Sequence, residues 1–283
     1  MSELGAELGA RRNSPGTSKR MGAVVKARLA QILPPLAWGA MFLLAWERFV
    51  IWRNIKPFLL PAPSAIWKQL NLNSDQIIQT SKATGSNALS GLIIGAILAV
   101  LIAFTAQRFS VVGGLLAPIA ADVNTMPIVA LGPVFYNLFG STSDTARRVV
   151  VALVAIFPIF VNTLKGLTQV EPVHEELMRS YAASGSKFLR LVRIPNALPF
   201  LLTGLRIGAS LSVIAAVVVE YFGGLQNGLG NRVSSAVNQS ANAKAWAYIC
   251  GACLLGLTFY TSALILERLA MPWQAKRKAS QSA

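Results

Sequence analysis

Residues 83–107 have the sequence ATGSNALSGLIIGAILAVLIAFTAQ, which is 25 residues long and carries no charged side chain. A bilayer core about 30 Å thick is crossed by ~20 apolar residues of α-helix, so this stretch is long enough to span a membrane. Further uncharged stretches have 22 residues (245–266), 21 residues (123–143) and 18 residues (29–46). One such stretch is compatible with a buried helix of a large soluble enzyme. Their repetition favours an all-α integral membrane protein.

The composition points the same way. Of the 283 residues, 54% are hydrophobic and only 13% are charged, whereas soluble domains carry about 25% charged residues. A net charge of +15 is also compatible with nucleic-acid binding. The lysines and arginines, however, lie at the ends of the apolar stretches and not in one patch, which is the pattern of cytoplasmic anchors. We therefore expect the lipid bilayer, and no nucleic acid, as a partner.

Six spans are predicted from the apolar stretches and the turn residues between them. They lie at about residues 30–52, 85–106, 110–139, 147–167, 199–222 and 246–267. The third is too long for one straight span and contains Pro118, Pro127 and Pro133, so we expect a broken or tilted element. Loops are expected at 53–84, with a short interfacial helix near Ser64–Leu70, and at 223–245.

The distribution of positive charge predicts the orientation of these spans. With both termini inside, the tails and inner loops carry 16 lysines and arginines and the outer loops and span ends carry nine, while Arg206 lies within a span. This bias favours cytoplasmic N and C termini. We expect a basic, disordered tail at 1–28, a transmembrane domain at 29–270 and a basic tail at 271–283. The first apolar stretch is too long for a signal peptide, so we interpret it as an uncleaved span.

The longest inner loop, residues 171–199, is too polar to cross the membrane. Its apolar residues form a partial face opposite a charged one. The apolar face is made by Leu177, Tyr181, Phe188, Leu191 and Val192, and the charged face by Glu175, Glu176, Arg179, Lys187 and Arg190. Pro195 and Pro199 are expected to end the helical run before the fifth span begins. A cytoplasmic helix pair joined rigidly to a span can transmit a push from a soluble partner.

The spacing of this loop resembles the EAA loop in permeases of binding-protein-dependent importers. That pattern is Glu-Ala-Ala, three residues, Gly, nine residues, then Ile-x-Leu-Pro. Glu176 falls on the Glu, Val192 takes the place of the Ile, and Ile194-Pro195 stands for Leu-Pro. The spacing is kept throughout.

Besides the exchanges of Val for Ile and Ile for Leu, three positions depart from the EAA pattern. Leu177 and Met178 stand where it has Ala-Ala, and Ala182 stands where it has Gly. Glycine is the residue best suited to a tight turn, so the neighbouring Gly185 is a candidate to serve in its place.

The resemblance covers about residues 30–270. The run from Asn124 to Ile128 through Phe139-Gly140, and the run Phe157–Thr163, are similar to the branch that imports nitrate, sulfonates, taurine, and riboflavin or thiamine-pyrimidine precursors. Residues 177–184, LMRSYAAS, are most similar to the vitamin-precursor members. An anion importer for sulfonates, taurine or nitrate is the alternative.

The resemblance implies the type I ABC importer permease fold in a bacterial cell membrane, with residues 171–199 forming a cytoplasmic coupling helix. Two permease copies pair as a homodimer, two cytoplasmic ATPases dock beneath them, and a periplasmic or lipid-anchored binding protein delivers the solute. Alternating access is then a rigid-body rocking about a central site. The residues expected to couple to the ATPase are Glu175, Glu176, Tyr181, Ala182, Ala183, Gly185, Ile194 and Pro195.

We expect no catalytic residue, cofactor or metal in this chain. The sequence contains no Gly-x4-Gly-Lys-Ser/Thr loop, so ATP and Mg are expected in the partner ATPase. Cys250 and Cys253 lie inside the sixth span without a third ligand. His174 is the only histidine and lies in a polar loop, so it forms no catalytic set.

Candidates for a pathway or gating role are the polar residues in or beside spans. They are Asp122, Asn124, Asn162, Arg206 and Glu220. A charge at mid-bilayer costs about 2.5–3.5 kcal/mol on insertion scales, so these charges face a pore, a neighbouring helix or an interface. The asparagines form either interhelical hydrogen bonds or solute contacts. Arg206 and Glu220 are ~21 Å apart along one helix and cannot pair within it.

Three other function classes need features that we do not find in the sequence. A secondary transporter favours an inverted repeat, a channel favours a filter or a ring of charges, and a membrane enzyme favours clustered His, Asp or Glu. The sequence therefore predicts an importer permease.

Overall fold

The computed structural model describes residues 17–109, 128–141 and 143–272, which form helices joined by turns and short irregular segments. The chain forms two compact units, residues 1–64 and 65–283. In the described residues four helices are long and apolar enough to cross a membrane: Ser74–Arg108, Thr145–Thr168, Gly185–Phe222 and Asn242–Ala270. These correspond to the second, fourth, fifth and sixth predicted spans.

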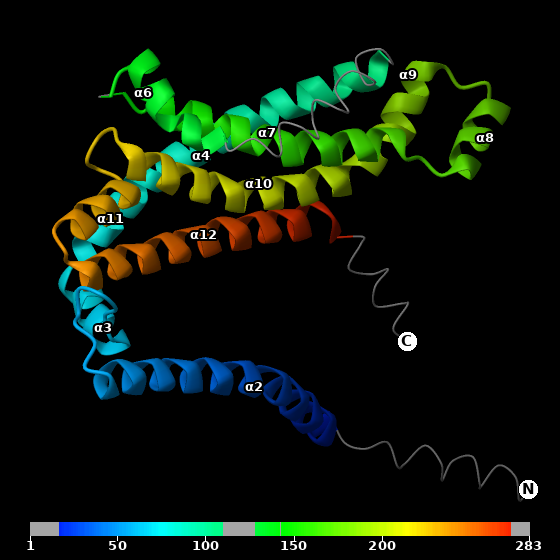
Figure 1. Ribbon diagram of the computed structural model, residues 1–283. Coiled ribbons are helices and arrows are strands. Elements are labelled where there is room, and N and C mark those ends of the chain that lie inside the picture. Colours follow the sequence, from blue (N-terminus) through cyan, green and yellow to red (C-terminus); the bar gives the residue numbers. More distant parts are fainter. Residues whose placement is uncertain (1–16, 110–127, 142, 273–283) are drawn as a thin grey trace, which may run out of the picture. The chain divides into compact units, whose positions relative to one another are not determined.

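The first unit contains one long helix, α2 (Thr17–Trp52). It begins within the segment 1–28 that was predicted to be a disordered tail. Pro34 and Pro35 therefore lie in the helix interior and not at its start. Proline removes a helix hydrogen bond and bends the axis, and α2 is curved in Figure 1. Glu47, near the end of α2, accepts hydrogen bonds from the backbone N (3.0 Å) and Oγ (2.7 Å) of Ser64.

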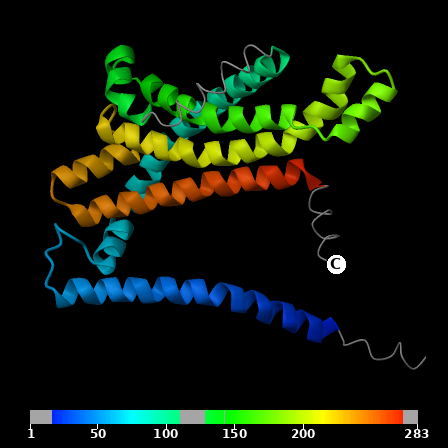
Figure 2. The same ribbon diagram turned by 45° about the vertical axis from the view of Figure 1, so that its right-hand side comes forward.

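The second unit is built on four long helices that pack on one another. Helix α7 (Thr145–Thr168) packs along both α4 (Ser74–Arg108) and α10 (Ile194–Phe222), and α12 (Asn242–Ala270) packs on α10 (Figures 1 and 2). The core between them is made largely of small and aliphatic residues such as Ala99, Ala155 and Ile159.

Glycines permit the close approach of these helices. A Cβ at Gly91 would lie 2.6 Å from the Cβ of Val151 in α7, and a Cβ at Gly204 would lie 2.8 Å from the carbonyl oxygen of Pro158. Both glycines belong to the small-residue spacings Gly91-x3-Gly95 and Gly204-x3-Gly208, which pack helices closely in membranes. A side chain at either position would collide with the neighbouring helix.

The fifth predicted span extends further than expected. Helix α9 (Gly185–Phe188) continues through a π-helical turn (Leu189–Arg193) into α10 without a break. Pro195 and Pro199 lie in α10 and do not end the helical run, so that prediction was wrong. In the π turn the backbone N–H of Ile194 bonds to the carbonyl of Leu189. This i→i+5 turn leads directly into α10. Pro195 lies at the first positions of α10, where the missing N–H of proline is tolerated.

Two predicted loops contain helix. Helix α3 (Pro63–Leu72) matches the predicted interfacial helix, but α4 already begins at Ser74, ahead of the apolar stretch. Helix α11 (Leu229–Asn238) lies in the loop 223–245, and its buried face includes Leu229, Val233 and Ala236. In the third predicted span the structure describes a short 3-10 turn (Ile128–Leu131) and α6 (Gly132–Phe139). Residues 110–127 lie outside the described residues.

Candidate functional site

The segment between α7 and α10 carries a helix whose side chains lie at the surface. Helix α8 (Pro172–Ser180) has proline near its start, where it is favoured, and side chains that are exposed or half-buried. Val173, Leu177 and Tyr181 repeat every four residues and so share one face, and Tyr181 is 76% exposed. The carboxyl groups of Glu175 and Glu176 are exposed beside them. An apolar stripe flanked by charge is typical of a helix that docks on a partner.

The turn after α8 is closed by its backbone. The N–H of Ala183 donates to the carbonyl of Met178 (3.0 Å), and the N–H of Ala182 donates to that of Arg179 (2.9 Å). This pair of bonds is the Schellman motif, which requires a left-handed residue at its centre. Ala182 takes that conformation, with φ of +47°. Ala182 therefore stands where the EAA pattern has glycine and adopts the conformation that glycine favours.

Gly185 does not replace that glycine. It is the first residue of α9, and Ser184 precedes it with an extended backbone. The alanine itself makes the turn.

The two ends of this segment are held together. The side-chain amide of Asn196, at the start of α10, donates to the carbonyls of Gly166 (2.8 Å) and Gln169 (2.9 Å) at the end of α7. These carbonyls are among those that a helix end leaves without partners. A Cβ at Gly166 would lie 2.7 Å from the Cα of Ala197, so the two backbones almost touch. The loop carrying α8 thus projects from a fixed base.

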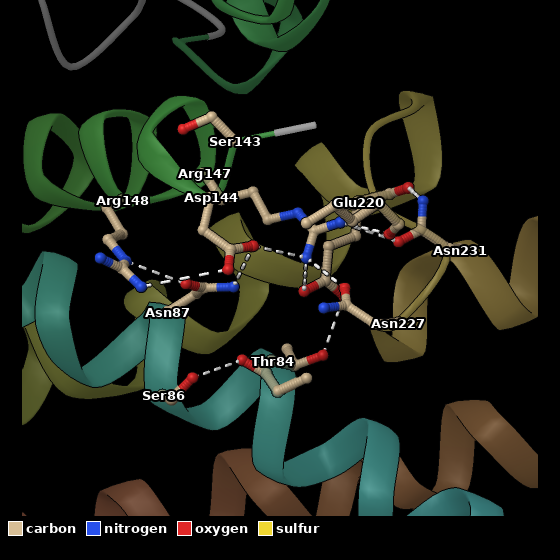
Figure 3. A network of polar contacts seen from close by, with 12 residues as sticks. Thr84, Ser86, Asn87, Ser143, Asp144, Arg147, Arg148, Glu220, Asn227 and Asn231 are labelled. Atoms are coloured by element: carbon tan, nitrogen blue, oxygen red, sulfur yellow. Dashed lines mark hydrogen bonds and ion pairs between the residues drawn. The ribbon is translucent and has the colours of Figure 1, made fainter. Parts of the chain in front are cut away.

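A second polar site lies at the opposite end of the α7–α10 pair (Figure 3). Arg147, in the first turn of α7, and Glu220, in the last turn of α10, are both fully buried. The Nη1 of Arg147 lies 3.7 Å from Oε1 of Glu220. Charged side chains are almost never fully buried unless they are paired, and here they pair with each other.

The guanidinium of Arg147 also holds the chain that follows α10. Its Nη1 donates to Oδ1 of Asn227 (2.7 Å) and to Oδ1 of Asp144 (3.1 Å). Its Nη2 donates to the carbonyl of Leu225 and to Oδ1 of Asn231 (3.3 Å). This use of several donors in a fixed fork is characteristic of arginine.

Glu220 links α10 to α4 and α11. Its Oε2 accepts hydrogen bonds from the hydroxyl of Thr84 (2.9 Å) and from the backbone N–H of Gly230 (3.0 Å). Thr84 in turn accepts one from the N–H of Leu229 (2.9 Å). Asn87, also in α4, donates to Asp144 (3.0 Å). The network therefore joins four helices at one end of the unit.

The chain matches one family model over most of its helical region. The model is that of the binding-protein-dependent transport system inner membrane component, and it covers residues 91–271, more than half of the chain. The chain belongs to this family. The match includes the α8 segment and, from the buried network of this permease, Arg147 and Glu220. Thr84 and Asn87 of the network lie before the matched residues.

The permease is similar to curated transport proteins along nearly its whole length. It is 30% identical to the formylaminopyrimidine transport permease protein ThiX of Halalkalibacterium halodurans, over 88% of this chain and 99% of that protein. It is also 30% identical to the riboflavin transport system permease protein RibX of Chloroflexus aurantiacus, over 83% of this chain and 88% of that protein. Permeases named for taurine and nitrate transport match at 25% and 24% identity.

A crystal structure shares the fold. The amino acid ABC transporter solved with histidines superposes with a TM-score of 0.57 at 16% identity, covering 69% of the permease and 94% of that chain. At this identity the likeness shows the fold alone.

The other candidate residues do not join either site. Arg206 forms an ion pair with Glu267 of α12, with Nη1 and Oε2 3.1 Å apart, and its guanidinium lies 6.0 Å from the ring centre of Tyr260. Asn162 donates to the carbonyl of Pro158 in its own helix (2.7 Å). Asp122 and Asn124 lie outside the described residues.

No metal-binding cluster of three His, Cys, Asp or Glu occurs in the part of the chain that the structure describes. Cys250 and Cys253 are free thiols there.

The sequence interpretation singled out Glu220 but missed its partner. Arg147 and Arg148 were both counted as cations at the outer end of a span. Asp144, three residues before Arg147, was a local sign that this arginine is held by an acid. The exposed Arg148, which donates to Asn87 (3.0 Å), shares that sign, so the spacing alone does not tell the buried arginine from the exposed one.

Proposed function

We propose that this permease forms the translocation pathway of a bacterial ABC importer and that α8 is the helix on which a separate ATPase docks. The observation that carries the proposal is α8 itself, which presents Val173, Leu177 and Tyr181 at the surface between two long apolar helices. A helix this exposed gains little from packing within its own chain. Burial of its apolar stripe in a groove of a partner would supply the missing contact.

Six spans and an N-inside, C-inside orientation complete the proposal. Four spans are the helices Ser74–Arg108, Thr145–Thr168, Gly185–Phe222 and Asn242–Ala270. The first span lies in α2, and the third is the element at 110–139. In this orientation α8 faces the cytoplasm, while the buried pair Arg147 and Glu220 lies toward the outer side of the membrane. The excess of lysine and arginine in the inner loops supports this arrangement.

The family supports the partners that we propose. Its members belong to binding-protein-dependent systems, so a periplasmic or lipid-anchored binding protein delivers the solute to the outer surface. ATP and Mg are held by the ATPase, and two permease copies pair as a homodimer. Rocking of the two copies opens the pathway alternately to each side. Asn162 and Arg206, together with Asp122 and Asn124, are the candidates for pathway or gating contacts.

The solute we propose is a vitamin precursor of the riboflavin or thiamine-pyrimidine type. The support is the run at residues 177–184 and the 30% identity to permeases named for formylaminopyrimidine and riboflavin transport. An anion such as taurine, a sulfonate or nitrate is the alternative, and relatives named for such solutes match at lower identity.

Charge reversal at Glu176 tests the docking role of α8. Glu176→Lys is expected to abolish co-purification of the ATPase and uptake, while the amount of permease in the membrane stays the same. Asp75→Lys is a matched control, because Asp75 is an exposed acid in the first turn of α4, away from α8. It is expected to leave both unchanged. Normal ATPase co-purification with full uptake in the Glu176→Lys variant would contradict the docking role.

Uptake by cells that carry the complete importer tests the solute. Labelled formylaminopyrimidine and riboflavin are offered with an excess of unlabelled taurine or nitrate. Uptake of a labelled precursor that the anions do not reduce supports the vitamin-precursor class. Uptake of labelled taurine or nitrate, with none of either precursor, supports the anion alternative.

A further inference from the structure

The helix pair α7–α10 is tied together at both ends. At the end next to α8, Asn196 bridges the two helices through Gly166 and Gln169. At the far end the bridge is the buried pair Arg147 and Glu220. Asn196 and Glu220 are 24 residues apart in α10, so the two ties are separated by about 36 Å at 1.5 Å per residue. Figure 1 shows α8 and α11 at these opposite ends.

The far tie reaches beyond the two helices. Arg147 bonds to Leu225, Asn227 and Asn231, all in residues 223–238, which we call the outer segment. Figure 3 shows the arginine extending from α7 toward Glu220 and Asn227. Glu220 binds the same segment through the N–H of Gly230. Both members of the ion pair thus bind the outer segment, so the pair links that segment to α7 and to α10.

The outer segment also lies directly against the end of α10. A Cβ at Gly228 would lie 2.2 Å from the carboxyl group of Glu220, and a Cβ at Gly230 would lie 2.0 Å from the carbonyl oxygen of Val217. Neither position has room for a side chain. The outer segment therefore lies in direct contact with the end of α10 around Glu220.

Stability alone is a weak reason for this ion pair. Replacing a buried ion pair by apolar residues of similar volume is often neutral or stabilising. Glu220 also keeps one oxygen, Oε1, without a hydrogen-bond donor among the described residues. What the charges provide is directionality, because guanidinium and carboxylate fix the angles at which the outer segment meets the two helices.

We propose that Arg147 and Glu220 are positioning residues that transmit movement of the α7–α10 pair to the outer segment during transport. The inference rests on the proposed function, because it needs an ATPase that acts on α8. ATP binding moves the base of the α8 loop, the helix pair moves with it, and the ion pair carries that movement to residues 223–238. In this role Arg147 and Glu220 act through the outer segment and not by binding solute or nucleotide.

The experiment follows the outer segment by thiol labelling in the permease bound to its ATPase. Gln226, which is exposed, is changed to cysteine in a background with Cys250→Ala and Cys253→Ala. The labelling rate is measured with and without a non-hydrolysable ATP analogue. We expect the analogue to change the rate in this parent. Arg147→Met and Glu220→Gln are expected to lose that difference while the ATPase still co-purifies.

Arg148→Met is the matched control. Arg148 is the next residue in α7 and its side chain is 44% exposed. Its guanidinium bonds to Asn87 and pairs with Asp144, and both of these residues lie outside the outer segment. It should keep the nucleotide-dependent difference. A role in stability alone would change the amount of folded complex but not this difference.

Several results would overturn the inference. One is a nucleotide-dependent difference in labelling rate that stays unchanged in both Arg147→Met and Glu220→Gln. Another is loss of that difference in the control Arg148→Met as well as in these two variants. If the two variants do not assemble with the ATPase, Asn227→Ala is used, because it removes one bond of Arg147 to the outer segment by changing an exposed residue. An unchanged labelling difference in Asn227→Ala also overturns the inference. A parent that binds the ATPase without any nucleotide effect overturns this inference alone. A parent that does not bind the ATPase overturns the proposed function too.

Discussion

At the scale of single residues, the turn after α8 illustrates a conformational demand met by a poorly suited residue. Ala182 has φ of +47°, a left-handed conformation that costs an L-residue with a Cβ roughly 1–2 kcal/mol. The two hydrogen bonds around it define a motif in which glycine is the usual central residue. The EAA pattern has glycine at this position, and the structure supplies the physical reason.

Ala182→Gly is expected to stabilise the turn. The gain is about 0.5–1 kcal/mol, because relief of the strained φ outweighs the larger entropy that glycine loses on folding. Hydrogen exchange at the amide of Ala183 should slow by roughly two- to fivefold. Gly185→Ala is the control, since a Cβ there meets open space and the residue is helical. The result that would contradict this is an Ala183 amide that exchanges faster in Gly185→Ala and at an unchanged rate in Ala182→Gly. It would show that Gly185 governs the turn.

Gly230 presents the opposite case, in which a missing side chain is required. Gly230→Ala should destabilise the folded permease by about 1–3 kcal/mol, because the added Cβ meets the carbonyl of Val217. Thermal unfolding in detergent measures the effect as a lower Tm. Gly256→Ala, a helical glycine of α12 whose added Cβ would meet only Val213 at 4.0 Å, should leave Tm unchanged or raise it. Equal Tm values for the two variants would contradict the close packing at Gly230.

At the scale of elements, the α7–α10 pair is the axis of the second unit. Small residues let the helices approach, and polar side chains fasten their ends. In α7 the polar groups Arg147 and Thr163 are buried, and Thr163 donates to the carbonyl of Ile159 in its own helix (2.6 Å). The interhelical bonds are concentrated at the two ends, through Asn196 at one and Arg147 at the other.

Asn196→Leu tests the fastening at the α8 end. The change keeps the approximate volume but removes the bonds to Gly166 and Gln169, each worth about 0.5–1.5 kcal/mol. The loop should open more often, so that trypsin cleaves at the exposed Arg179 and Lys187 several times faster. Thr168→Val is the control, because the Thr168 hydroxyl bonds within α7 and its loss leaves the base of the loop tied. Equal cleavage rates in the two variants would argue against the tie.

At the scale of the whole molecule, the proposed topology places the two functional ends on opposite sides of the membrane. α8 and the outer segment lie at opposite ends of α10, which belongs to a helix long and apolar enough to span a bilayer.

Single cysteines on the two ends test that topology in intact cells. Lys187→Cys and Gln226→Cys are made in the background without Cys250 and Cys253. A membrane-impermeant thiol reagent should label position 226 from outside and reach position 187 only after the cells are opened. Labelling of position 187, and not of position 226, from outside would show that the orientation is the reverse of the one proposed. Labelling of both positions from the same side would exclude a single span between them.

Much of the permease's architecture was accessible from local sequence. Four of the predicted spans correspond to helices long and apolar enough to cross a membrane, and the loop spacing around Glu176 indicated the family. Where the prediction was wrong or incomplete, the chain had a local backbone adjustment in one case and long-range packing in the other. The π turn let helix continue past Pro195, and burial of Leu229 and Val233 made a helix of a segment rich in Gly, Asn and Ser.

The amino-acid sequence by itself determined that this chain is a membrane protein with an exposed amphipathic loop, because apolar length and helical periodicity are properties of neighbouring residues. Only the tertiary structure decided that Arg147 is the partner of Glu220 and that Arg148, with the same local signs, is not. The choice depends on which arginine α7 turns toward α10 when the helices pack. That rotation is set by contacts between segments far apart in the chain, such as Gly91 against Val151, which no local pattern encodes.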